Sequence, residues 1–273
     1  MSISASDSAW LCRPFAPVDI AGLDARAAMM ERLDNKYIVD AAVLARALPE
    51  FSAQFDILEI DGRRAFAYEN CYFDGPGWQS YFDHHQGRRR RSKVRMRKYL
   101  DAGLCFVEVK LKDRRGITVK KRRACDPAAY GSLDAAACDY VAAAYRDMYR
   151  RDFPHSLSRT LDTRYTRVTL VAHGGGERLT IDTALAFAVE GTSRSLGDRL
   201  FILETKSANG NGIADRILRR LHQHPVKHCS KYCTGMAFLQ QGLKHNNFKP
   251  VLRRLTDLLG EAELPASAYP ARS

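Results

Sequence analysis

Two apolar segments of the chain end in the same arrangement of charged residues. The segments Cys105 to Lys110 and Phe201 to Lys206 both finish in Glu-x-Lys. Successive side chains of a β-strand point to opposite faces, so each glutamate shares a face with the lysine two residues later. A carboxylate among lysines can hold a divalent metal beside a phosphate chain, and it can equally form a salt bridge. For Glu108 and Glu204 the residues alone leave both interpretations open.

The same spacing places basic side chains on one face of several further strands. In the segment Lys93 to Tyr99, the side chains of Lys93, Arg95 and Arg97 share a face. At least five strands carry the pattern, and its other members are Arg32, Asp34, Lys36, Glu108, Lys110, Thr118, Lys120, Arg122, Tyr165, Arg167, Glu204 and Lys206. A solvated outer face would explain a single strand of this kind. If the sheet closes, these faces line one interior, and because buried Lys and Arg repel one another that interior must hold water and an anion.

Strands make up most of the elements that would position these side chains. The alternation predicts strands at Leu33 to Val39, Phe55 to Ile60, Arg64 to Phe73, Arg91 to Tyr99, Leu104 to Lys112, Ile117 to Arg123, Thr163 to Ala172, Arg178 to Phe187 and Leu200 to Ser207. Helices are expected at Pro17 to Met30, Ala41 to Leu48, Ser132 to Arg151 and, divided near Pro225, Asn209 to Gly242. Short turns join most strands, which indicates an α+β protein with an antiparallel sheet or barrel surrounded by helices. The helices around Asp134 to Tyr149 and Ile213 to Leu239 would cover outward apolar faces.

The positive charge of the chain is concentrated in one segment. The 273 residues carry 43 Lys+Arg and 31 Asp+Glu, a net charge of +12, and Arg88 to Arg123 alone holds 16 of the basic and 3 of the acidic residues. This indicates a localised anion site and not a generally basic protein. The composition is that of a globular protein, without an apolar run long enough for a membrane helix. Seven cysteines without framework spacing favour reduced thiols and a cytoplasmic protein.

The order of these motifs resembles a known family. The matching stretches are Arg32 to Tyr37, Tyr72 to Asp74, Lys93 to Arg97, Glu108 to Lys110, Thr118 to Arg122, Tyr165 to Arg167, Glu204 to Lys206 and Ser230 to Tyr232. Together they resemble the VTC domain, or polyphosphate polymerase domain, of the CYTH/triphosphate-tunnel superfamily. The resemblance covers roughly residues 28 to 242. No single motif is specific, and the specificity comes from eight motifs in the family's order.

The resemblance implies a fold and a set of site residues. The fold would be an antiparallel β-barrel tunnel that binds triphosphate and polyphosphate. Residues matching the principal, catalytic phosphate ligands are Lys36, Arg95, Arg97, Lys110, Arg167 and Lys231, and further phosphate-binding positions are Arg32, Lys120, Arg122, Tyr165, Lys206 and Ser230. Glu204 resembles the carboxylate that holds Mn²⁺ or Mg²⁺ in the VTC branch, and Glu108 is the second candidate metal ligand. Asp182 is a guess for a supporting carboxylate.

The implied activity is transfer of the ATP γ-phosphoryl group to a growing polyphosphate chain. Hydrolases of the superfamily have Glu-x-Glu-x-Lys in the first strand, where this chain has Arg32, Asp34 and Lys36. One metal-binding carboxylate is therefore missing, which disfavours simple hydrolysis. A metal-dependent tripolyphosphatase or nucleoside triphosphatase and a non-catalytic polyphosphate sensor remain as alternatives. A nucleic-acid binder is disfavoured, because such proteins display basic residues outward beside aromatic platforms.

The expected partners are ATP and inorganic polyphosphate, with no nucleic acid. The family's yeast relatives combine this domain with an SPX domain and membrane helices. We expect neither in this sequence, so export of the product through a membrane would need a separate membrane protein partner. The oligomeric state is left open. We expect an N-terminal extension at 1–15, the tunnel domain at 16–245, and a C-terminal helix with a loose tail at 246–273.

Two further clusters have competing interpretations. The histidines and cysteines of residues 222–233 form either a zinc site or, as we expect, surface histidines beside buried thiols. Their spacing matches no standard zinc finger. The run Arg88 to Arg91 is interpreted as a solvated loop at a tunnel mouth that attracts polyanions.

Overall fold

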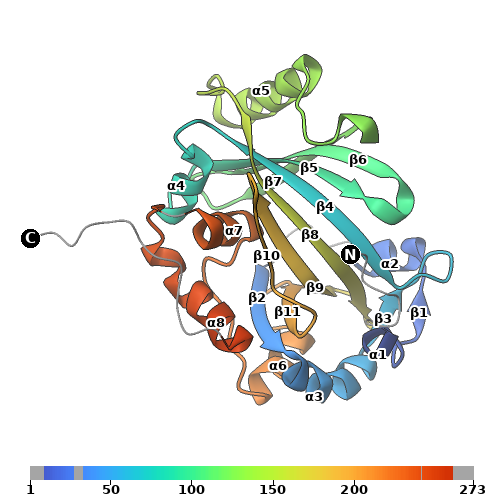
Figure 1. Ribbon diagram of the computed structural model, residues 1–273. Helices are drawn as coiled ribbons and strands as arrows, with labels where there is room; N and C mark the ends of the chain where they lie inside the picture. The colour runs from blue at the N-terminus through green and yellow to red at the C-terminus, as the bar shows by residue number, and fades with distance from the viewer. Residues whose placement is uncertain (1–8, 28–32, 241, 261–273) are drawn as a thin grey trace, which may run out of the picture.

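One large antiparallel sheet organises the computed structural model, which describes residues 9–27, 33–240 and 242–260 (Figure 1). Its main path runs β2-β11-β9-β8-β4-β5-β6-β7, and β3 and β10 extend it at the side. The two-residue β1 pairs with β3 in the parallel sense. The strands are β1 Pro17–Val18, β2 Leu33–Asp40, β3 Phe55–Leu58, β4 Ala65–Asp74, β5 Arg91–Tyr99, β6 Leu104–Lys112, β7 Thr118–Cys125, β8 Ser158–Ala172, β9 Glu177–Val189, β10 Thr192–Ser195 and β11 Leu200–Ser207. The expected α+β class with an antiparallel sheet is confirmed.

Alternation predicted the central strands well. The bounds of β5 and β6 agree with the sequence prediction to the residue. In β5 the residues between the basic ones, Ser92, Val94 and Met96, are buried on the opposite face. The short strand β10 and the helix α4, Gln79–His85, were not predicted, because neither carries a period-2 or period-3.6 pattern long enough to stand out.

The sheet does not close into a hydrogen-bonded barrel, contrary to the expectation. Among the described strands, β2 and β7 end the path and do not pair with one another. The sheet is nevertheless curved around an inner side. Ile38 of β2 and Tyr72 of β4, which are separated by three strands along the path, belong to one buried apolar cluster with helix α7, Lys231–Leu239. The result is a tunnel-like fold with an inner face and an outer face.

Helices cover the outer face in two places. Under α5, Ala135–Tyr149, the residues Val141 and Ala144 pack against apolar side chains of β5 and β6. Under α3, Ala41–Ser52, and α6, Ile213–Arg220, a second core forms with residues of β2, β8, β9 and β11. Aspartates cap α3 and α5: the carboxylate of Asp40 accepts from the Val43 amide, and that of Asp134 from the Ala137 amide. These apolar faces therefore point outward and are buried by helices, as the pattern predicted.

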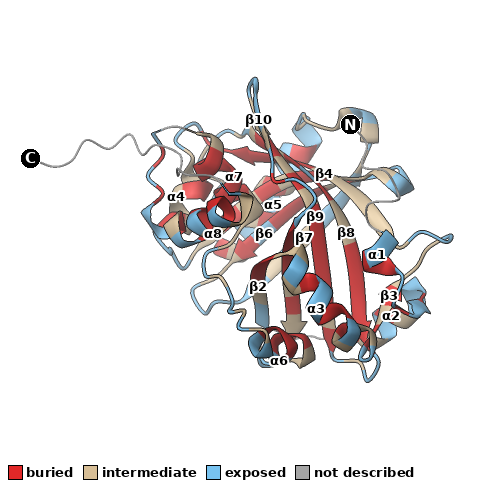
Figure 2. Ribbon diagram, turned by 60° about the horizontal axis from the view of Figure 1, so that its bottom comes forward, coloured by how far each residue is buried: buried red, intermediate tan, exposed pale blue. Residues whose placement is uncertain are grey.

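Helix α7, Lys231–Leu239, packs on the inner face and not, as expected, on the outer one. Its buried Tyr232 and Met236 join a core with Ile38, Ile202 and Tyr165, which belong to the inner side of the strands. Figure 2 shows α7 among the most buried helices of the molecule. The helix thus brings its first residue, Lys231, to the concave side of the sheet.

The remaining helices pack around this frame. They are α1 Ala9–Cys12, α2 Ile20–Ala27 and α8 Lys249–Leu259. Leu11 of α1 contributes to the outer core, and Leu252 of α8 to the inner one. Residues 1–8 and 261–273, which include the expected loose tail, lie outside the described residues. No helix within the described ranges has the length and apolar character needed to span a bilayer.

Candidate functional site

Charged side chains from neighbouring strands meet on the inner face because the register aligns them. Arg95 on β5 lies opposite Glu108 on β6, and Lys36 on β2 lies opposite Glu204 on β11. The cationic residues of this face are Lys36, Lys93, Arg95, Arg97, Lys110, Lys120, Arg122, Arg167, Lys206 and, from α7, Lys231. Three carboxylates, those of Glu108, Asp182 and Glu204, lie among them. Each carboxylate is held between two of the cations, and this arrangement defines the site.

Glu108 is the first of these three carboxylates. Arg95 donates from Nε (2.7 Å) and Nη2 (2.5 Å) to its Oε2, and Lys120 contacts its Oε1. The side chain of Glu108 is only 2% exposed. Burial would raise its pKa, but the charges of Arg95, Arg97 and Lys120 outweigh burial and lower the pKa to about 2. Glu108 is therefore ionised and has both oxygens engaged by cations.

Asp182 on β9 is the second, and it is buried. Arg167 on β8 donates from Nε (2.6 Å) and Nη2 (2.8 Å) to its two carboxylate oxygens. Lys231 from α7 donates to the same carboxylate. Burial opposes ionisation, but the two cations hold the pKa of Asp182 well below its usual range. Asp182 therefore fixes a strand arginine and the helix lysine in one position.

Glu204 on β11 is the most accessible of the three. Its Oε2 lies 2.8 Å from Nζ of Lys36, and Lys206 contacts its other oxygen. The side chain of Glu204 is 18% exposed, against 1–2% for the other two carboxylates. In the register, the neighbouring pair is Asp34 opposite Lys206. Glu204 is thus the carboxylate that an incoming ligand can reach.

A buried tyrosine lies among the arginines in the middle of the face. Arg97 donates from Nη2 to the hydroxyl of Tyr165 (2.8 Å) and from Nε to the side-chain oxygen of Asn70 (2.8 Å). Nζ of Lys231 lies 4.6 Å from the centre of the Tyr165 ring. Burial would raise the pKa of Tyr165, but Arg97, Arg167 and Lys231 outweigh burial and lower it to about 8. The local field therefore favours negative charge strongly enough to ease ionisation of a buried phenol.

Two lysines, Lys93 and Lys110, lie opposite each other on the inner face, near the first residues of β5. Nζ of Lys93 donates to Oγ of Ser230 (2.7 Å) and lies 3.3 Å from Nδ1 of His84. Desolvation, followed by the charges of Lys36 and Lys93, lowers the pKa of Lys110 to about 8. Lys110 is nevertheless accessible to solvent. The lowered pKa therefore reflects the surrounding protein and the neighbouring cations, and the ammonium group remains within reach of a ligand.

The structure brings most of the predicted site residues together. Those on the inner face are Lys36, Arg95, Arg97, Lys110, Lys120, Arg167, Lys206, Lys231, Tyr165, Ser230, Glu108 and Glu204. Arg122 shares this face as well, because it lies opposite Glu108 in the register, and its exposed side chain lies over the ring of Phe106. Arg32 lies outside the described residues. Asp182, which was only a guess from the sequence, lies between Arg167 and Lys231 and contacts both.

Sequence reasoning left four participants out of the site set. Lys93 stands two residues before Arg95 and could have been included by the same alternation. Asn70, His84 and Tyr68 carry no comparable signal, because nothing in the sequence says which polar residue of a neighbouring element will meet an arginine. The ring of Tyr68 lies beneath the guanidinium groups of Arg97 and Arg167. Within the described residues no group of three His, Cys, Asp or Glu side chains could hold a metal, including at 222–233.

Comparison with known proteins identifies the family of the chain. Residues 31–240 match the model of the VTC domain, so the chain belongs to the VTC domain family. No curated protein matches the chain.

The solved structures that match the chain are distant in sequence. One is a candidate adenylate cyclase from Bacillus halodurans, with 15% identity and a TM-score of 0.48, covering 74% of this chain and 95% of the other. Another is a candidate adenylyl cyclase from Hippeastrum described as having a dominant triphosphatase activity, with 14% identity, a TM-score of 0.49, and coverage of 75% and 94%.

Proposed function

We propose that the protein is a polyphosphate polymerase that transfers the γ-phosphoryl group of ATP to the end of an inorganic polyphosphate chain. The observation that carries the proposal is the inner face of the sheet, where ten lysines and arginines surround three carboxylates. So many positive charges on one enclosed face, several of them partly buried, are costly unless an anion with many charges occupies the space. Membership of the VTC domain family supports a condensed phosphate as that anion.

The three carboxylates, those of Glu108, Asp182 and Glu204, each bind two cations and so fix the positions of these cations before substrate binds. Arg95 and Arg167 each have a paired carboxylate on the neighbouring strand, which holds the guanidinium plane and leaves its remaining N–H groups to bind phosphate. Phosphoryl transfer depends mainly on positioning and charge neutralisation, so a preorganised cationic face is the part of the catalyst that the protein must supply.

The transfer forms one bond and breaks one. A terminal oxygen of the polyphosphate chain forms a bond to the γ-phosphorus, and the bond from that phosphorus to the β-γ bridging oxygen breaks, with both electrons leaving on ADP. In this proposal Arg97, Arg167 and Lys231 bind the phosphates that flank the reacting centre, while Lys36, Lys93 and Lys110 bind phosphates nearer the β5 start of the face. No covalent intermediate with the protein is required.

The residues present fit a divalent cation at Glu204. Mg²⁺ and Mn²⁺ prefer oxygen ligands, and in phosphate sites one or two carboxylates are completed by water and substrate oxygens. Both glutamates have each oxygen held by a cation, Glu108 by Arg95 and Lys120 and Glu204 by Lys36 and Lys206. Glu204 is nevertheless 18% exposed and held by two lysines, whereas Glu108 is 2% exposed and held by an arginine through two nitrogens. A bound cation would neutralise phosphoryl oxygens of ATP. We therefore assign Glu108 to neutralising and orienting Arg95, and not to binding the metal ion.

Two features favour transfer over hydrolysis. The first strand offers Asp34 and Lys36 but lacks the pair of glutamates that the hydrolases of the superfamily have, so fewer carboxylates are available to hold a metal with its water. The face is also lined by cations along several strands, which suits a chain longer than a triphosphate. A metal-dependent tripolyphosphatase is the second candidate, because the same face would bind tripolyphosphate.

The test is to incubate the purified protein with ATP and either Mn²⁺ or Mg²⁺ and to resolve all products. ADP together with long-chain polyphosphate is the expected result. ADP with orthophosphate alone, or cleavage of added tripolyphosphate, would replace the proposal with the hydrolase. Absence of turnover, combined with thermal stabilisation by polyphosphate, would replace it with a non-catalytic sensor.

A further inference from the structure

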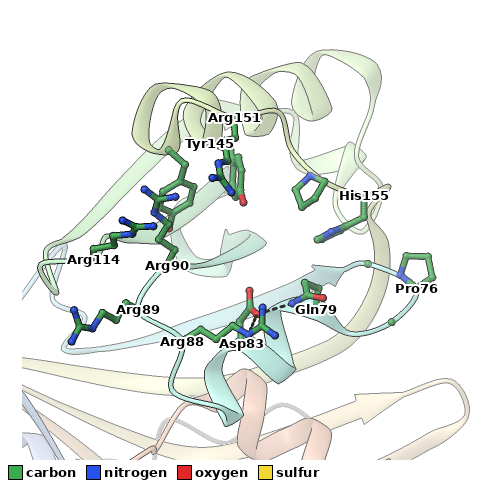
Figure 3. A pocket seen from close by; sticks show the side chains of 14 residues that line it. Pro76, Gln79, Asp83, Arg88, Arg89, Arg90, Arg114, Tyr145, Arg151 and His155 are labelled. Atoms are coloured by element: carbon green, nitrogen blue, oxygen red, sulfur yellow. Dashed lines mark hydrogen bonds and ion pairs between the residues drawn. The ribbon is translucent and has the colours of Figure 1, made fainter.

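A second cationic site lies outside the inner face. A cavity of about 870 Å³ opens between α4 and α5 (Figure 3). Its charged lining residues are Asp83, Arg88, Arg89, Arg90, Arg114 and Arg151. Within the described residues Arg88 lies 3.4 Å from Asp83, and the other four arginines form no ion pair. Five guanidinium groups around one carboxylate make this cavity strongly attractive to anions.

The walls of the cavity are held by buried hydrogen bonds. The Asp74 carboxylate accepts from the amides of Gly75, Ser80 and Tyr81, and so fixes the turn that forms one wall. On the other side the hydroxyl of Tyr149 binds backbone atoms of β5 and β6, which anchors the end of α5. These hydrogen bonds fix two walls of the cavity, from which the arginines extend on the adjoining segments.

One polar group in the wall has no partner. Nε2 of His155 is buried without a hydrogen bond within the described residues. The ring packs directly against the backbone of Gly75, since a Cβ added at that residue would lie only 2.5 Å from a ring carbon. Figure 3 shows His155 across the cavity from Arg90 and Arg114. A buried ring nitrogen without a partner is costly unless a ligand or water completes it.

The position of the cavity connects it to the inner face. Arg88, Arg89 and Arg90 directly precede β5, the strand that carries Arg95 and Arg97. Arg114 follows β6 by two residues, and the pair Arg91 and Lys112 joins the two strand ends. The cations thus continue from the inner face, around the corner of the sheet, into the cavity.

The chemistry of the lining favours condensed phosphate over nucleic acid. Guanidinium groups bind phosphate oxygens in pairs of parallel hydrogen bonds. Base recognition would need an open aromatic ring, but the Tyr145 ring packs against Tyr149 at 4.6 Å and against Phe153 at 5.0 Å. The cavity also lacks the outward basic stripe with aromatic platforms that is typical of nucleic-acid binders.

We propose that this cavity is a second phosphate-binding site, which holds the part of a polyphosphate chain that lies outside the inner face. The identity of the ligand rests on the proposed function, whereas the cavity and its charge do not. A chain held at both sites would stay bound between successive additions. Removing the cavity arginines should therefore weaken binding of long chains and leave binding of short ones intact.

The experiment compares two triple variants of the full chain. One replaces Arg90, Arg114 and Arg151 by Ala. The matched control replaces the exposed Arg46, Arg219 and Arg253 by Ala, which removes the same charge on other helices. Titration calorimetry with long-chain polyphosphate and with tripolyphosphate measures affinity and stoichiometry for both variants and the unmodified protein. We expect the cavity variant to lose affinity for the long chain by on the order of tenfold or more, with tripolyphosphate and the control variant unchanged.

Three results would overturn this inference. Equal long-chain affinity in the cavity variant and the unmodified protein would mean that the cavity takes no part. Two tripolyphosphate molecules per protein, falling to one in the cavity variant while long chains bind unchanged, would make it a separate site for a small phosphorylated molecule. Tighter binding of single-stranded DNA than of polyphosphate, lost in the cavity variant, would make it a nucleic-acid site.

The same variants distinguish failure of this inference from failure of the proposed function. If the unmodified protein forms no polyphosphate from ATP, but the cavity variant still loses long-chain affinity, the polymerase proposal is wrong and the second site stands. If polyphosphate is formed and long chains bind equally to both proteins, the second site is wrong and the polymerase proposal stands.

Discussion

Arg167 on β8 and Asp182 on β9 are joined by two hydrogen bonds, of 2.6 and 2.8 Å, in the interior of the curved sheet. Lys231 contacts the same carboxylate, so this one aspartate connects two strands and the inner helix α7. The pair explains how two cations can remain buried side by side in the absence of phosphate.

The substitution Asp182→Asn should destabilise the fold, because it leaves the charges of Arg167 and Lys231 buried without compensation. We expect a loss of about 3–5 kcal/mol in the free energy of unfolding, measured by urea denaturation. Polyphosphate should then raise the melting temperature of this variant more than that of the unmodified protein, since phosphate replaces the missing charge.

Asp162→Asn is the matched control, since Asp162 forms an exposed ion pair with Arg159. It should cost less than about 1 kcal/mol. If Asp182→Asn is no more destabilising than this control, the central role given to Asp182 is wrong.

Glu204→Gln should abolish most turnover while polyphosphate binding persists. The amide removes the charge that would hold a divalent cation, and turnover should fall on the order of 100-fold or more. Binding of polyphosphate, measured separately by calorimetry, depends on the cations and should remain. Glu59→Gln, which alters a surface ion pair with Arg64, serves as the control. Full activity of Glu204→Gln would remove this residue from the metal site.

Polyphosphate affinity should fall as the pH rises through about 8. The pKa of Lys110 is lowered to about 8 by desolvation and by Lys36 and Lys93, so the free protein loses this positive charge above that pH. A bound phosphate chain raises the pKa again, and binding is therefore accompanied by proton uptake. Between about pH 7 and about pH 9 the affinity should drop by up to about tenfold.

The variant Lys110→Arg should flatten this pH dependence, because arginine remains charged throughout the range. Tyr165 titrates in the same range, and Tyr165→Phe measures its separate contribution. Calorimetry in buffers of different ionisation enthalpy counts the protons taken up. An unchanged pH profile in Lys110→Arg would assign the dependence to another group.

Arg97→Lys should impair catalysis although it keeps the charge. The arginine bridges Asn70 and Tyr165 with two nitrogens of its planar group, which a single ammonium cannot reproduce. We expect kcat to fall roughly 10- to 100-fold, with the free energy of unfolding changed by less than about 2 kcal/mol. Arg46→Lys, at an exposed position of α3 away from the inner face, should behave like the unmodified protein. Equal effects of the two substitutions would argue against a positioned guanidinium at Arg97.

Local periodicity predicted those parts of the fold that depend on neighbouring residues. The strands β5 and β6 and their charged face follow from alternation, because each residue's side is determined by its two neighbours. The Glu-x-Lys motifs correctly marked strands of the inner face. Alternation within one strand does not show which residue of a neighbouring element will pair with each charged side chain.

Non-local packing accounts for what the sequence did not reveal. Helix α7 was expected outside the sheet, to cover an outward apolar face of the strands. An apolar helix fits either face, and its contacts with Ile38 and Ile202, together with the pairing of Asp182 with Lys231, place it on the inner one. The open edges of the sheet depend on the relation between β2 and β7, which stand at opposite ends of the strand path. The cavity between α4 and α5 was visible only as the run Arg88 to Arg91, since α4 itself has no clear pattern.

The most direct test of the central claim follows the γ-phosphoryl group itself. The protein is supplied with an unlabelled polyphosphate chain, a divalent cation and ATP labelled in the γ-phosphate, and the label is traced with time in the unmodified protein and in Arg167→Ala. The account predicts that label enters the chain in step with ADP release and that Arg167→Ala abolishes this incorporation. Label found only in orthophosphate while ADP accumulates would contradict it.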